Sequence, residues 1–198
     1  MEAPGDIYEP TFDLASLTEE QRREYSRHQF TSTFSTGLTI FLHLITAGIF
    51  TIIYFGLKHS KLPKIRHDDF GAGRAIGFYF IPGFNFYWVF RFCLRLVDRV
   101  NFQLRLRGLK TTISKGFVLA TVIIGIISVA LFGFASLPIA QEYIMEHMIG
   151  PAVGPPVTAM LVLAVVMYTI CVGKGQIATN RLAEKTTLER QEGTNPER

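Results

Sequence analysis

Long apolar blocks alternate with short, highly charged segments along this chain. Residues 34–57, 116–140 and 157–173 contain no Asp, Glu, Lys or Arg. A helix needs about 20 apolar residues to cross the hydrocarbon core of a bilayer. Because these blocks approach or exceed that length, the pattern predicts an all-α integral membrane protein with three or four transmembrane helices.

A fourth apolar block, residues 75–90, is rich in aromatic side chains and is interrupted by Pro82 and Gly83. Proline removes a backbone hydrogen bond and glycine permits a sharp turn. Freed backbone groups cannot face lipid. We therefore expect a short re-entrant segment, with a kinked full span as the alternative. If the broken backbone encloses a path, Asn85 is a polar residue that would line it.

Helical periodicity with a basic face follows from Trp88 over residues 88–108. At 100° per residue, Arg91, Arg95 and Arg99 fall on one face, opposite an apolar stripe. This pattern predicts an amphipathic helix that lies in the membrane interface, with its basic face solvated or against lipid headgroups. A site for an anion or a partner protein is the alternative for the same face.

Polar segments flank the membrane domain of residues 34–173. Residues 1–33 predict a flexible tail followed by a polar helix, which begins at a capping box formed by Thr18 and Gln21. Residues 58–74 predict a dense polar loop. Residues 174–198 carry charges of both signs and predict a polar tail.

The distribution of Lys and Arg predicts the orientation. Residues 58–74 hold five and residues 91–115 hold seven, whereas residues 141–156 hold none and the C-terminal tail holds five. Basic loops remain on the cytoplasmic side. We therefore expect a multi-pass protein of the plasma or inner membrane with a cytoplasmic C-terminus. If residues 75–90 are re-entrant, both basic segments are cytoplasmic and the acidic N-terminus lies outside.

The candidate chemical groups are few. His43 is the one ionisable group of the first block, and packing between helices is favoured over a proton relay, which needs a partner. His59, His67, Asp68 and Asp69 have the ligand types of a metal site. Their spacing fits no standard metal motif, and the surrounding Lys and Arg residues favour charge pairing. We therefore expect no metal ion.

Other functional classes are disfavoured by composition and by the motifs found. The chain has no phosphate-binding loop, dinucleotide fingerprint, nucleophile elbow or zinc pattern. Its net charge of +4 does not indicate nucleic acid, because the basic residues lie beside apolar blocks, where they would meet anionic headgroups. Cys93 and Cys171 lie in apolar stretches and are expected to be buried thiols. We expect no cofactor, no nucleic-acid partner and no enzymatic activity.

A short internal echo aligns Gly48 in ITAGIF with Gly83 in IPGFNFYW. The same region, residues 37–109, resembles an uncharacterised family of small prokaryotic membrane proteins. The matching pieces are LHLITAGIFTIIYF, HSKLPKIRHDDFGAGRAIGF and FIPGFNFYWVFR with RLVDRVN. This resemblance implies a membrane location and no assigned activity.

Together these features predict a structural or accessory membrane protein. We expect it to contact anionic headgroups and to pack against other membrane subunits or copies of itself. The alternative is a small channel, carrier or lipid-handling protein whose path is lined by residues 75–90.

Overall fold

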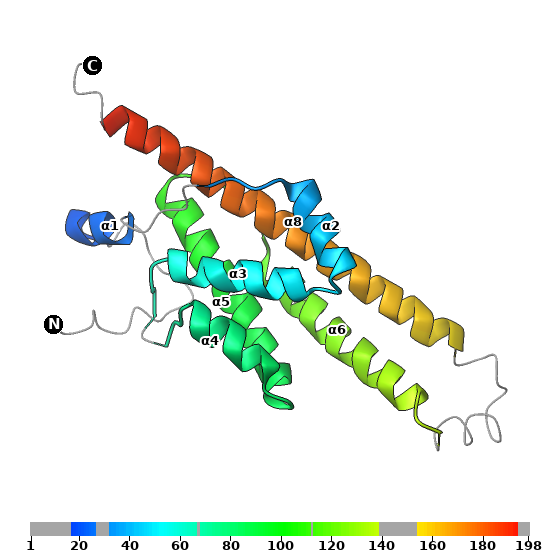
Figure 1. The fold of residues 1–198 in the computed structure, drawn as a ribbon. Helices are drawn as coiled ribbons and strands as arrows, with labels where there is room; N and C mark the ends of the chain where they lie inside the picture. Colours follow the sequence, from blue (N-terminus) through cyan, green and yellow to red (C-terminus); the bar gives the residue numbers. More distant parts are fainter. Residues whose placement is uncertain (1–16, 27–31, 67, 112, 139–153, 194–198) are drawn as a thin grey trace.

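The computed structural model describes residues 17–26, 32–66, 68–111, 113–138 and 154–193. The elements found there are all helical, as expected, and Figure 1 shows their arrangement. They are α1 (Glu19–Ser26), α2 (Thr36–Ile45), α3 (Ile49–Lys61), α4 (Ala72–Gly77), the 3-10 helix η2 (Phe78–Phe80), α5 (Phe84–Leu106), α6 (Lys115–Ala135) and α8 (Gly154–Gly193).

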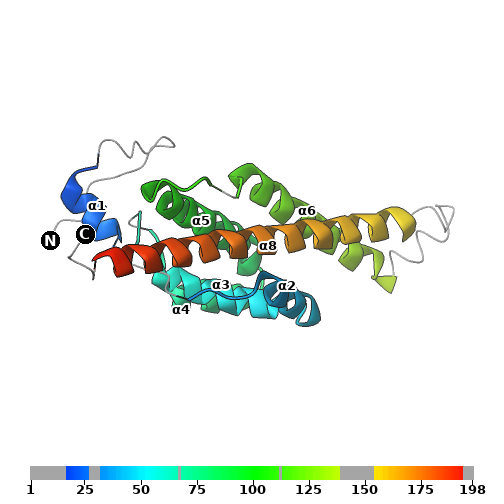
Figure 2. The same cartoon turned by 90° about the horizontal axis from the view of Figure 1, so that it is seen from above.

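Two of the described helices are long and apolar enough to cross a membrane: α6 and the segment Pro155–Glu189 of α8. They pack against each other over much of their length, and their apolar ends project beyond the other helices (Figures 1 and 2). Only 22% and 17% of their apolar windows are buried inside the molecule. A soluble core helix would be covered on most sides, so this exposure favours contact with lipid.

The first expected span is wrong as a single helix. Residues 34–57 divide into α2 and α3, which are joined by a turn in which Ala47 has φ 47° and Gly48 has φ 88°. The amide of Gly48 donates to the carbonyl of His43 over 2.8 Å, which ends α2 in a left-handed turn. An apolar run long enough to cross a membrane thus forms a hairpin of two short helices.

A second hairpin follows, and it contains the expected break at Pro82 and Gly83. Here α4 and η2 form one arm and α5 the other, and Gly83 has φ 76°. The arms are fastened by Trp88, whose indole N–H donates to the carbonyl of Ala75 over 3.0 Å. The echo between Gly48 and Gly83 therefore corresponds to two hairpins that each turn at a glycine with positive φ.

Both hairpins turn toward the apolar ends of α6 and α8 (Figures 1 and 2). The loop after α3, the C-terminal end of α5 and the C-terminal end of α8 lie at the opposite end of the molecule. Helix α1 lies there too, because the ring of Tyr25 packs edge-on against Phe102 of α5, with 5.3 Å between centroids. Loops and charged helix ends are thus gathered at one end.

Two further expectations need correction. The helix expected over residues 88–108 is found as part of α5, which ends at Leu106, but α5 packs against α1, α3, α6, α8 and η2 instead of lying exposed in an interface. The expected polar tail after residue 174 continues α8 as a helix to Gly193. Its Gln176 and Thr179 are buried, and Arg107 of α5 pairs with Glu189 at 3.5 Å.

Replacing Gly48 or Gly83 by alanine should destabilise the protein by about 1–3 kcal/mol, because a side chain is strained at these positive φ angles. Gly73→Ala is the matched control, since Gly73 is helical and an added Cβ meets nothing within 4 Å. That control should be neutral or stabilising by up to about 1 kcal/mol. Thermal denaturation in mild detergent measures all three, and equal stability for all would contradict the two-hairpin fold.

Candidate functional site

Arg99 of α5 is the most completely enclosed charge of the described residues. Its side chain is 1% exposed and donates only to groups of the α3 end and the following loop. Nε donates to the carbonyl of Pro63 over 2.9 Å, Nη1 to that of Phe70 over 3.1 Å, and Nη2 to that of His59 over 2.7 Å. Nη2 also donates to the carbonyl of Leu62. We call this set the Arg99 cage.

His59 completes the cage with its ring. Nη1 of Arg99 lies 3.1 Å from Nδ1 of His59. Because a guanidinium has only donors, Nδ1 must accept, and the neutral ring carries its proton on Nε2. Burial and then the charge of Arg99 lower the pKa of His59 to about 3. Burial also lowers the pKa of Arg99 to about 10, so the arginine stays charged and the histidine stays neutral at neutral pH.

Lys58 is a second buried cation, adjacent in sequence but bound to a different helix. Its ammonium donates to Oε1 of Gln176 over 3.2 Å and to Oγ1 of Thr179 over 2.6 Å, both on α8. It also lies 4.4 Å from the ring centroid of Tyr54. Burial, and then the charge of Lys61, lower the pKa of Lys58 to about 7.

The loop after α3 is folded by its two aspartates. Asp69 accepts from the amides of Ile65 and Arg66, at 2.8 and 3.0 Å, through its Oδ2. Asp68 turns toward α5, where its Oδ2 pairs with Arg91 at 2.5 Å and also with Arg95. The aspartates of this loop are thus paired with cations, as expected, but the cations are Arg91 and Arg95 of α5 and not the neighbouring Lys and Arg residues of the loop. Arg99 is buried in the cage and not on a solvated face.

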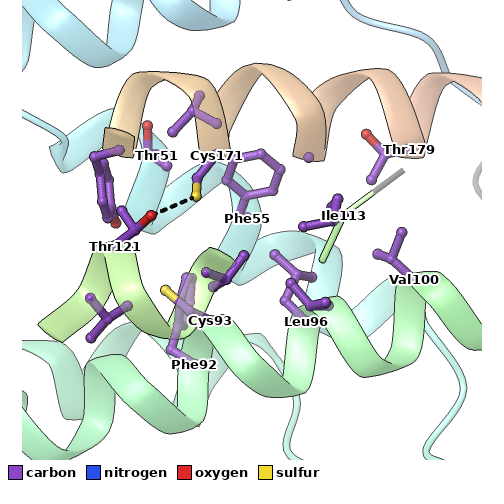
Figure 3. Close-up of a pocket in the computed structure, with 16 residues that line it drawn as sticks. Thr51, Phe55, Phe92, Cys93, Leu96, Val100, Ile113, Thr121, Cys171 and Thr179 are labelled. Carbon is purple, nitrogen blue, oxygen red and sulfur yellow. Dashed lines mark hydrogen bonds between the residues drawn. The ribbon is translucent and has the colours of Figure 1, made fainter. Parts of the chain in front are cut away.

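A small apolar cavity of about 60 Å³ lies between α3, α5, α6 and α8 (Figure 3). Thr51, Thr121 and Thr179 contribute hydroxyl groups to its wall, and Cys93 and Cys171 contribute thiols. Oγ1 of Thr121 and Sγ of Cys171 are in hydrogen-bond contact at 3.3 Å. A cavity that binds benzene measures about 150 Å³, so this space is a packing gap and not a substrate site.

The remaining sequence candidates have packing positions. His43 is buried, with Nδ1 2.8 Å from Oγ1 of Thr51 and its ring stacked on Tyr168. Pro82 and Gly83 are exposed at the tip of the second hairpin, and Asn85 follows them at the start of α5. Pro82, Gly83 and Asn85 line neither the cavity described above nor the two surface clefts beside His59 and Asp68.

The structure does not bring together the set considered for a metal. His59 is in the Arg99 cage, Asp69 caps the loop and Asp68 pairs with arginines, whereas His67 lies outside the described residues. Within those described residues, no group of three His, Cys, Asp or Glu side chains is arranged to hold an ion.

Sequence reasoning missed Lys58 and its partner Gln176. Lys58 ends an apolar block, which normally marks a residue at the headgroup level. Gln176 and Thr179 follow the last apolar block at i, i+3 spacing, which is the available signal that they share a helix face.

No protein-family model, no curated protein and no solved structure matches this chain. The resemblance of residues 37–109 to an uncharacterised membrane family therefore stays a prediction.

Arg99→Met should destabilise the protein by about 3–5 kcal/mol, because it leaves buried carbonyls without their donor. Arg105→Met, on the exposed side of the same helix, should change stability by less than about 0.5 kcal/mol. The fraction that stays monodisperse after heating in detergent measures the difference. Similar losses for both variants would show that the cage contributes nothing specific.

Lys58 should make stability depend on pH. Its folded-state pKa of about 7 is below the unfolded value of 10.5, so between these values the unfolded chain binds a proton that the folded chain does not. Stability should therefore rise as the pH increases from 7 to 9, by at most about 1.4 kcal/mol per pH unit. Lys58→Met should abolish this rise, whereas Lys64→Met, at an exposed loop position, should retain it. An unchanged slope in Lys58→Met would refute the assignment.

Proposed function

We propose that this protein is a non-catalytic, structural or accessory membrane protein that packs against a second membrane protein. The observation that carries the proposal is how its buried ionisable side chains are used. Arg99, His59 and Lys58 bind backbone carbonyls, each other and neutral side chains of neighbouring elements. Each therefore fastens one element to another. Arg99 and His59 also line a cleft of about 430 Å³, but the guanidinium that borders it is already bound to the carbonyls of the Arg99 cage.

Apolar exposure at the other end supports membrane insertion. Large apolar side chains are exposed at both hairpin tips, namely Leu44, Ile45, Ile49, Phe80, Ile81, Phe84, Phe86 and Tyr87. Contiguous apolar surface of this kind on a monomer indicates contact with a membrane or a partner. In this proposal the spanning pair is α6 and α8, and both hairpins dip into the bilayer from the charged end.

Helix lengths support a partial depth for the hairpins. At 1.5 Å per residue, α2 is about 15 Å long and α3 about 20 Å, which is less than the hydrocarbon core of about 30 Å. The depth of the second hairpin can be compared with α6, because Asp98 of α5 lies at the level where α6 begins, 2.9 Å from Lys115. From Asp98 to the turn at Gly83 there are 15 residues, about 22 Å along α5. Helix α6 is longer, at about 31 Å.

This arrangement also changes the proposed orientation. With two half-depth hairpins, the three basic segments (residues 58–74, 91–115 and 174–198) and helix α1 lie on one side of the membrane. The positive-inside rule makes that side the cytoplasm. The N-terminus is then cytoplasmic, in contrast to the expectation from sequence, because the first block turns back before it crosses.

The channel or carrier alternative has less support. It required the backbone around Pro82, Gly83 and Asn85 to line a path, but the turn is exposed at a hairpin tip. The largely apolar cavity between the helices is also far smaller than a ligand pocket of about 300–1,000 Å³.

The partner surface we propose lies on the apolar half of α6. Gly125 and Gly133 lie eight residues apart, about two turns, and so share one face of α6 with Val129, which is 57% exposed. A Cβ at either glycine meets nothing within 4 Å. Small residues on one helix face let another helix approach closely in lipid. The described residues leave the space beside both glycines open.

Purification of the tagged full chain from its native membrane in mild detergent should yield a stoichiometric membrane protein partner. Gly125→Leu with Gly133→Leu should remove that partner, because the new side chains fill the approach, while thermal stability stays near that of the wild type. Ala130→Leu, an equivalent enlargement at another exposed position of α6, should retain it. Mass spectrometry of the intact assembly measures the stoichiometry. Purification of the protein without a partner, or retention of the partner by the double glycine variant, would contradict the proposal.

A further inference from the structure

A cleft of about 370 Å³ opens between the loop after α3, the middle of α5 and the first residue of α6. Its charged lining consists of Arg66, Arg91, Arg95 and Lys115 with Asp68 and Asp98. Four cations thus face two carboxylates. We call this the interfacial cleft.

The cations of the interfacial cleft share their carboxylate partners. Oδ2 of Asp68 pairs with both Arg91 and Arg95. Oδ2 of Asp98 lies 2.9 Å from Lys115 and 3.7 Å from Arg66. With four cations and two carboxylates, the described residues of the lining carry a net positive charge. Asp69 also lies 3.9 Å from Arg95, but it is buried outside the lining and its other oxygen caps the loop.

The donors of the interfacial cleft suit a phosphate group. Guanidinium groups present several N–H donors in a planar fork, which matches two oxygens of a phosphate, and an ammonium adds a point charge. Arg91 and Lys115 retain side-chain exposures of 29% and 52%. Both can therefore reach a ligand that enters from outside.

Apolar surface continues from the interfacial cleft toward the membrane end. Tyr87, Phe90 and Leu94 line the cleft beside the charges. Outside the lining, Phe86 is exposed on α5, and Leu119 and Ile123 are exposed on α6. A ligand with a phosphate at one end and long apolar chains would satisfy both surfaces. A free phosphate ion would satisfy only the first.

We propose that the interfacial cleft binds the headgroup of an anionic phospholipid in the leaflet that the hairpins enter, with the acyl chains against α5 and α6. This inference rests on the membrane insertion in the proposed function. It names a lipid class and a site that the packing role alone does not require.

The test is a titration of the detergent-purified full chain with phosphatidylglycerol and with phosphatidylcholine, followed by native mass spectrometry. Phosphatidylglycerol should bind at least about tenfold more tightly. Arg91→Gln with Lys115→Gln should weaken its binding about 25-fold, because each headgroup contact by a cation near the surface is worth about a fivefold change. Lys115→Gln alone, at a half-exposed position, should weaken binding about threefold to fivefold and serves if the double variant does not fold.

The matched control is Arg105→Gln with Lys110→Gln, which removes the same charge from exposed positions outside the interfacial cleft. It should change binding by less than about twofold. An equal loss in this control, or equal affinity for phosphatidylcholine, would overturn the proposal. Displacement of the lipid by inorganic phosphate at millimolar concentration would instead identify a free-phosphate site and overturn the lipid assignment.

A separate control distinguishes failure of this site from failure of the proposed function. Membranes that contain the wild type and the double variant are extracted with alkaline carbonate. Both should stay in the membrane, because insertion depends on the apolar helices. If the wild type is released, membrane insertion itself is wrong. If both are retained but lipid selectivity is absent, only the interfacial cleft assignment fails.

Discussion

The guanidinium of Arg99 is the interaction on which the charged end of the molecule depends. The last carbonyls of a helix have no partner within the helix, and at the end of α3 two of them, from His59 and Leu62, accept from Arg99. Pro63 and Phe70 of the following loop accept from the same group. One side chain on α5 therefore ends α3, shapes the loop and joins the two hairpins. A cation at this position also complements the negative end of the α3 dipole.

The position of the loop follows from the Arg99 cage, and the interfacial cleft follows from the loop. With its ends held at Leu62, Pro63 and Phe70, the loop turns through the cap made by Asp69. That turn directs Asp68 toward Arg95 and Arg91, which lie about one and two turns before Arg99 on α5. The same helix therefore contributes the buried cation Arg99, which builds the loop, and two less buried cations, Arg95 at 12% and Arg91 at 29% side-chain exposure. The arginines on this face of α5 thus differ in how deeply they are buried.

Part of this architecture could be predicted from the sequence, and the failures have physical causes. The blockwise pattern of charge correctly predicted helices and the two that can cross a membrane. A hydropathy pattern cannot detect a turn inside a charge-free run, and so residues 34–57 were expected to be one helix. The informative signal was local: the glycine in Thr46-Ala47-Gly48 occupies the same place as Gly83. The turn at Pro82 and Gly83 was expected because proline interrupts a helix and is visible in the sequence.

The expectation for Arg99 failed for a different reason. A helical projection assigns a solvated face to the charges of one helix, but it cannot show that a distant loop folds over that face. Lys58 was missed because its partners lie more than a hundred residues away, on a part of α8 that was expected to be a tail. Gln176 and Asn180 also bind the backbone of Phe34, which precedes α2. Long-range polar contacts of this kind are specified by the fold and leave no mark in local composition.

The helices are joined by different interactions at the charged end and at the apolar end of the molecule. At the charged end, cations and amides join α3, α5 and α8. At the apolar end, the contacts between α6 and α8 involve weakly polar groups, such as Ser128 Oγ donating to the carbonyl of Met160 over 3.2 Å. Lipid tails cannot replace the polar contacts of the charged end. They can replace apolar contacts between α6 and α8, because burial of apolar surface gives no advantage within a bilayer. A partner helix that reaches α6 through Gly125 and Gly133 would therefore add close packing at the end where the chain itself supplies least.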